Sequence, residues 1–85
     1  MPPLSPGESL DTPAGAQSVT IRIVEAADGR QVKAFGTVSD GSDTHRFNLD
    51  STGSKSKTVS LSSGASYRVE LSQNSKADVN VSTKR

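Results

Sequence analysis

The sequence predicts an all-β fold, a small antiparallel β-sandwich of six to seven strands with an extended N-terminal arm. From Ser18 onward, apolar residues alternate with polar residues with the period of two that is typical of strands. Short clusters of Gly, Asp, Asn and Ser interrupt this alternation at regular intervals, as turns do. No segment has the apolar spacing of a helix. Because each strand then has one dry face and one wet face, two sheets have to pack together to bury both dry faces.

The first 17 residues differ from the rest and predict an extended or disordered arm over 1–17, followed by the sandwich domain over 18–85. All four prolines lie in this segment, and their positions exclude a regular helix or a central strand. Two interpretations are open: a tail without a role, or an arm that becomes ordered on a neighbouring subunit, with two leucines as anchors. The candidate partner-binding residues of the arm are Pro2, Pro3, Leu4, Pro6, Leu10 and Pro13.

The alternation predicts six strands in the domain, over residues 18–25, 31–39, 44–49, 57–61, 66–71 and 77–82. Asp28-Gly29 lies between the first two, and Asp-Gly is a strong signal for a hairpin turn. Val24 and Phe35 depart from the alternation near this turn. We therefore consider them either an apolar spot on the outer face of the hairpin that contacts a partner, or local packing at a bulge.

Catalytic and metal-binding motifs are sparse. The chain has no cysteine, which excludes disulfides and thiolate sites. Its single histidine, His45, lies in phase with Phe47 and Leu49, which predicts that it is packed or lies at a sheet edge. There is no second histidine with which it could build a metal site. The serines lack a Gly-x-Ser-x-Gly motif, and Asp40-Gly41-Ser42-Asp43 misses the calcium-binding spacing of an EF-hand. We expect a protein that is not an enzyme and needs no cofactor or metal.

The charge balance gives no strong indication of an electrostatic partner. Ten basic and nine acidic residues leave a net charge of +1, and the pI is about 8.1. A nucleic-acid binder usually carries a basic face and aromatic platforms, so no nucleic acid is expected as a partner. The sequence has neither a long apolar run nor the features of a signal peptide, which predicts no membrane partner and a cytoplasmic protein or a component of a particle assembled there.

One stretch resembles a hairpin of immunoglobulin-like sandwich modules. In residues 58–71, Val59, Leu61, Gly64, Tyr67 and Val69, followed by Leu71, have the spacing V-x-L-x-x-G-x-x-Y-x-V-x-L. In those modules the run joins two late strands, and the tyrosine packs at a sheet corner. The resemblance covers about fourteen residues and concerns architecture, because a fold does not determine a function.

In general type, the chain also resembles small head-decoration or minor capsid proteins of tailed bacteriophages. The shared traits are the absence of cysteine, a Ser- and Thr-rich sandwich and a terminal arm that contains proline. The resemblance implies a non-enzymatic virion protein on the capsid surface, bound to the major capsid protein or to neighbouring subunits through its arm. It also implies a homo-oligomer, trimers being common in that class. The alternatives are an adhesin-like or ligand-binding sandwich module of a surface protein, and a regulator that acts through an exposed sheet edge.

Overall fold

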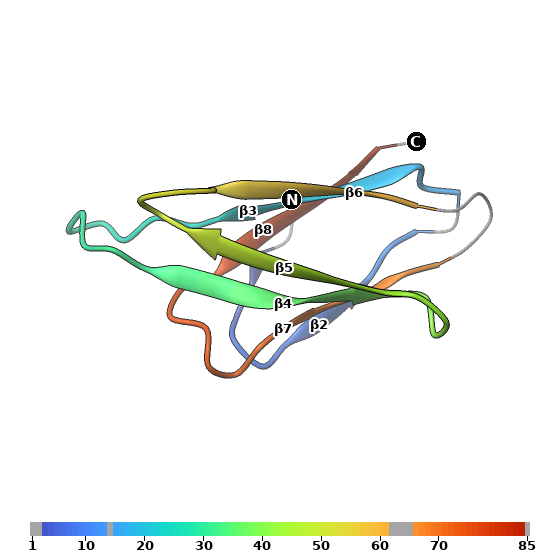
Figure 1. Ribbon diagram of the computed structural model, residues 1–85, viewed down its shortest axis with the longest axis horizontal. Coiled ribbons are helices and arrows are strands. Elements are labelled where there is room, and N and C mark those ends of the chain that lie inside the picture. The colour runs from blue at the N-terminus through green and yellow to red at the C-terminus, as the bar shows by residue number, and fades with distance from the viewer. Residues whose placement is uncertain (1–2, 14, 62–65, 85) are drawn as a thin grey trace.

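Two antiparallel sheets packed face to face make up the fold (Figure 1). The computed structural model describes residues 3–13, 15–61 and 66–84. Within these ranges the chain forms eight strands and no helix. The strands are β1 (Pro3–Leu4), β2 (Ser9–Asp11), β3 (Ser18–Ile23), β4 (Lys33–Ser39), β5 (Thr44–Asp50), β6 (Ser56–Ser60), β7 (Arg68–Leu71) and β8 (Val79–Lys84). The predicted all-β sandwich is therefore confirmed.

The strand order is β1-β8-β3-β6 in one sheet and β2-β7-β4-β5 in the other. Strands β3 to β8 correspond to the six strands predicted from the alternation, and their ends differ from the prediction by no more than two residues. Local alternation locates these strands well because each has one face in the interior and one in solvent.

The pairing of the strands differs from the sequence prediction at two places. The segment with Asp28-Gly29 does not close a hairpin, because β3 pairs with β6 and β8 whereas β4 pairs with β5 and β7. Likewise, β6 and β7 are not hydrogen-bonded neighbours, although the resemblance implied a hairpin there. In both cases the chain crosses from one sheet to the other. An Asp-Gly turn signal marks where the chain reverses, but it does not decide which strands pair.

The N-terminal segment, expected as an arm, contributes an edge strand to each sheet. Pro3 and Leu4 pair with Asn80 and Val79 of β8, and Ser9–Asp11 pairs with β7. Between the two strands Gly7, at a φ of +86°, turns the chain from one sheet to the other. The prolines did exclude a central strand, but proline is accepted on an edge strand, where one side of the backbone has no partner. Pro2 lies outside the described residues.

The core lies between the two sheets and receives side chains from the inner faces of both. Val19, Ile21, Val38, Val69 and Val79 are among the side chains that are almost completely buried. Burial of a side chain of this size stabilises the folded state by about 1.5–3 kcal/mol. The buried hydrophobic cluster consists of Leu4, Val19, Ile21, Ile23, Val32, Ala34, Val38, Phe47, Leu49, Val59, Tyr67, Val69, Leu71, Val79 and Val81.

Gly36, in the middle of β4, is a position where the backbone leaves no room for a side chain. A Cβ atom at this residue would collide with the backbone carbonyl oxygen of Glu70 and lie 2.8 Å from Cζ of Phe47. Both neighbours belong to the sheet itself, since Gly36 pairs with Phe47 of β5 and with Leu71 of β7. The glycine thus allows Phe47 to pack over the sheet and β7 to approach β4.

We expect Gly36→Ala to lower the free energy of unfolding by about 1–3 kcal/mol or more, because β7 or the ring of Phe47 has to move. Urea denaturation followed by circular dichroism measures the change. Gly53→Ala is the matched control, since the nearest atom to a Cβ there is the Cβ of Asp50 at 3.8 Å. Equal stability of the two variants would contradict this account of Gly36.

Candidate functional site

The structure places the predicted arm residues in different environments. Leu4 is buried in the core at 4% exposure, and Leu10 is partly buried against the same core. Pro3, Pro6 and Pro13 are exposed. The two leucines, which the sequence suggested as anchors for a partner, therefore contact this chain's own interior. Any partner contact of Leu4 requires the segment to leave this position.

Backbone hydrogen bonds continue the pairing of the N-terminal segment beyond its two strands. The amide of Gly7 donates to the carbonyl of Leu71 at 3.0 Å, and the amide of Leu71 donates to the carbonyl of Glu8 at 3.0 Å. Thr12 and Tyr67 form a reciprocal pair: the Thr12 amide donates to the Tyr67 carbonyl at 2.7 Å, and the Tyr67 amide donates to Oγ1 of Thr12 at 2.9 Å. Both residues are buried, so this pair fixes the end of the segment beside β7.

Val24 and Phe35, the other predicted partner-binding residues, do not share a face. Val24 follows β3 in one sheet, and its amide donates to the carbonyl of Asp78 at 2.9 Å. Phe35 lies in β4 of the other sheet, where its amide and carbonyl both bond Oγ of Ser75 at 3.0 Å. Val24 is 39% exposed and Phe35 is half-buried. The hairpin face expected from the sequence does not exist, because β3 and β4 belong to different sheets.

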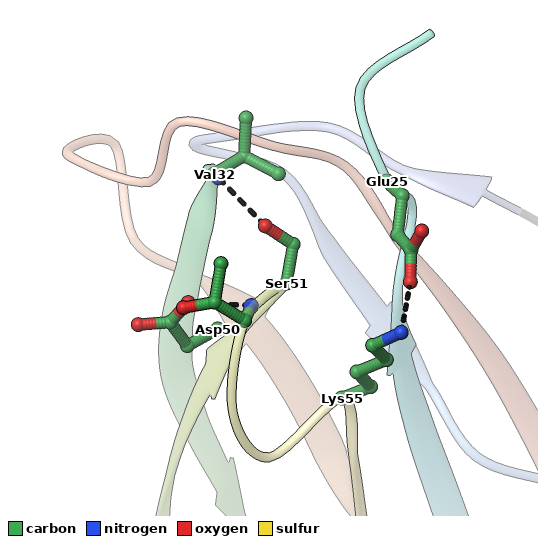
Figure 2. Close-up of polar contacts among 6 residues, drawn as sticks. Glu25, Val32, Asp50, Ser51 and Lys55 are labelled. Atoms are coloured by element: carbon green, nitrogen blue, oxygen red, sulfur yellow. Dashed lines mark hydrogen bonds and ion pairs between the residues drawn. The ribbon is translucent and has the colours of Figure 1, made fainter. Parts of the chain in front are cut away.

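The loop after β5 is held by a compact set of polar contacts (Figure 2). One Asp50 oxygen accepts bonds from the amide and the hydroxyl of Thr52, at 2.9 and 2.8 Å, and both carboxylate oxygens accept from Nε2 of Gln31. Figure 2 shows Oγ of Ser51 accepting from the amide of Val32 at 2.9 Å. These bonds fasten the loop to the segment that leads into β4, and they occupy the Asp50 carboxylate.

The same view shows an ion pair beside this loop. Nζ of Lys55 lies 2.7 Å from Oε1 of Glu25, and both side chains are about half exposed. Solvent screens such a pair, so its contribution to stability is small. The pair joins the loop before β6 to the segment after β3.

Three carboxylates have a lowered pKa. Hydrogen bonds from the backbone of Asp43 and then Ser42 lower the pKa of Asp40, and those from the backbone and hydroxyl of Thr52 lower the pKa of Asp50. For Glu25, the hydrogen bond and charge of Lys55 lower the pKa. The main partners of Asp40 and Asp50 lie in the same loop as the carboxylate, whereas Lys55 reaches Glu25 from a different segment. Each contact stabilises the ionised form, which is a structural role for a carboxylate.

The edge of the sandwich formed by β5 and β6 holds basic residues that the sequence did not single out as a site. His45 and Arg46 of β5 and Lys57 of β6 line a groove between the two edge strands, and all three are exposed. The sequence did contain a signal for this surface. His45 and Lys57 are basic residues, yet each is in phase with the core residues of its strand. On an edge strand, an inward-pointing charge prevents pairing with another sheet.

The described residues hold no group of three or more His, Asp or Glu side chains that could bind a metal ion. The surface hollows are open rather than enclosed. One of them combines Phe35, Thr37 and Asn48 on the outer face of the β2-β7-β4-β5 sheet. Within the same residues, no helix is long and apolar enough to cross a lipid bilayer.

The Asp50 carboxylate should make the stability of its loop depend on pH in acid. A carboxylate whose pKa is lowered below its ordinary value of 3.8 stabilises the fold above that value, and this stabilisation is lost as the pH falls through the lowered pKa. We therefore expect Asp50→Asn to reduce the loss of stability below about pH 4. Thermal unfolding at several pH values measures it. Asp78→Asn is the control, because among the described residues no hydrogen bond or ion pair involves the Asp78 side chain. A control that flattens the acid profile equally would contradict the role of Asp50.

Leu4 of the N-terminal segment should contribute to the stability of the whole fold, because it lies in the core. We expect Leu4→Ala to reduce the free energy of unfolding by about 2–5 kcal/mol, because it leaves a cavity in the core. Val24→Ala removes a side chain that is 39% exposed and serves as control. Urea denaturation of the two variants compares the costs. If Leu4→Ala costs no more than Val24→Ala, the segment does not occupy its place in the core in solution.

No protein-family model, curated protein or solved structure matches this chain. The established result is the architecture, a small all-β sandwich of two sheets. Tyr67, which the immunoglobulin-like resemblance placed at a sheet corner, is buried directly before β7, where the chain has crossed between the sheets.

Proposed function

We propose that this protein is a non-enzymatic structural protein that acts by binding other protein subunits, with its N-terminal segment as the exchangeable element. The observation that carries the proposal is the double docking of residues 3–11. This short segment adds an edge strand to each sheet and inserts Leu4 into the core.

The contacts of the segment are of a kind that a second copy can supply equally well. The segment pairs with β8 and β7, and a neighbouring copy has the same two strands. Exchange of identical elements between copies replaces each contact by the same contact, so it costs little free energy and is favoured by a high local concentration. The connection over residues 12–17 contains Pro13 and Gly15, and it determines whether the segment folds back or reaches a neighbour.

A decoration protein on a viral capsid is one form of this proposal. A shell presents many identical sites close together, and multivalency would make weak individual contacts sufficient. The partners would then be the major capsid protein or neighbouring copies, in a homo-oligomer such as a trimer. An adhesin-like or ligand-binding module is the second candidate. The observation that favours it is that Leu4 is buried in the chain's own core, as a monomer requires.

A cross-linking experiment separates these two functions. Pro3 and Asn80 are directly paired in β1 and β8, at a separation that suits a disulfide between antiparallel strands. Because the chain has no cysteine of its own, the double variant Pro3→Cys/Asn80→Cys carries only the engineered pair. With exchange, we expect oxidation at high protein concentration to give covalent dimers or trimers, and light scattering to show the same oligomers before oxidation.

The control pair is Thr20→Cys/Thr58→Cys, which joins β3 to β6 inside the body. It should cross-link within one chain at every concentration. If the Pro3→Cys/Asn80→Cys variant also gives only monomers on a non-reducing gel, and the protein stays monomeric at high concentration, the exchange proposal is wrong and the monomeric module is favoured.

A further inference from the structure

The side of the sandwich opposite the N-terminal strands has two open edges. β5 pairs only with β4, and β6 pairs only with β3, so the second edge of each strand lacks a strand partner among the described residues. The two strands follow each other in the chain, and in Figure 1 they diverge from the loop that joins them. Unpaired amide and carbonyl groups on these edges are available to an extended peptide.

A groove of about 410 Å³ lies between these edges. Val59, at 5% exposure, is the one buried residue of its lining, and hydroxyl groups and basic side chains supply the rest. Its lining residues are Thr44, His45, Arg46, Lys57, Thr58, Val59 and Ser60.

The charge of this groove is not compensated. No acidic residue lines it, and within the described part of the chain neither Arg46 nor Lys57 forms an ion pair. Some basic groups elsewhere are paired: Lys55 pairs with Glu25, and Arg68 lies near Asp11 and Glu70. Other exposed basic groups, such as Lys76, also form no ion pair among the described residues, but the groove brings two such groups together with no acidic residue in its lining. Asp43 precedes β5 but is not among the lining residues.

We propose that the β5–β6 groove binds an acidic, extended peptide segment of a partner protein. The backbone of such a segment would pair with an open edge, and every second side chain would point towards Arg46 and Lys57. Alternating carboxylates match this spacing. The basic side chains disfavour pairing with a neutral or basic strand, so the same charges that protect the edge would select an acidic ligand.

This inference rests on the proposed function in one respect, that the protein acts through protein contacts. Its surface is separate, because β1 and β2 form the opposite edges of the two sheets. Binding in the groove can therefore be measured whether or not the N-terminal strands exchange.

The experiment uses the full chain labelled with ¹⁵N and titrated with a short synthetic peptide in which glutamate alternates with threonine. We expect amide shifts concentrated in residues 44–50 and 56–60. Arg46→Gln and Lys57→Gln should each weaken binding by about two- to fivefold, as expected for exposed charge pairs, and the double variant should weaken it further. Added salt should weaken it as well.

Lys76→Gln is the matched control, because Lys76 is exposed and outside the groove. It should bind the peptide as the natural sequence does. An equal loss in the control would show a general charge effect and would overturn the assigned site. The proposal would also be overturned if the peptide with glutamine in place of glutamate bound equally well, or if a sulfated disaccharide shifted these residues while the acidic peptide did not. None of these outcomes depends on the cross-linking result.

Discussion

The fold depends on pressing two sheets together over a thin layer of medium-sized apolar side chains. The core contains mostly valine, isoleucine and leucine, with Phe47 and Tyr67 as its two rings. Side chains of this size fill the space only if the sheets approach closely. Within one of the sheets, Gly36 makes room for the ring of Phe47, one of the two aromatic side chains of this core. In a thin core, each buried side chain accounts for a large share of the net stability, because the net stability of a domain is a small difference between large opposing terms. This explains why the N-terminal segment is folded into the body: Leu4 adds to a core with few large residues.

The part of the fold that was predictable from sequence is the part determined locally. An alternation such as Val19, Ile21 and Ile23 specifies a strand and its dry face without knowledge of its neighbours. Pairing is a different problem, since it depends on which edges are free after all strands have formed. Nothing near Asp28-Gly29 indicates that β3 pairs with β8, a strand that lies almost at the other end of the chain. The strands of residues 3–11 escaped prediction because segments of two and three residues are too short to show a period.

For the candidate surfaces too, local features were predictable from the sequence, whereas features that depend on strand pairing were not. Leu4 and Leu10 were correctly distinguished as the sizeable apolar residues of the segment, but which interior they contact is a tertiary property. The apolar spot expected at Val24 and Phe35 was inferred from a hairpin between β3 and β4. The two strands belong to different sheets, so the two residues do not share a face. Conversely, the basic groove contains Arg46 and Lys57, which are eleven positions apart and unremarkable along the sequence. They come together only because β5 and β6 are the edge strands on the same side of the sandwich.

The two sides of the sandwich solve the problem of exposed strand edges in different ways. On one side the edge strands are short and one begins with a proline, so few backbone groups are left open. On the other side β5 and β6 are longer, and basic or titratable side chains occupy inward positions at their ends. A short edge strand offers few backbone hydrogen bonds to any incoming strand. Charged side chains on an edge instead discriminate between incoming strands by the sign of their charge. The first side is therefore suited to an element that docks through a single buried leucine, and the second to one that is recognised by its charge. Because the outer faces of the sandwich are largely polar and its apolar residues are nearly all used in the core, these two sides are the surfaces to which we assign the proposed protein contacts.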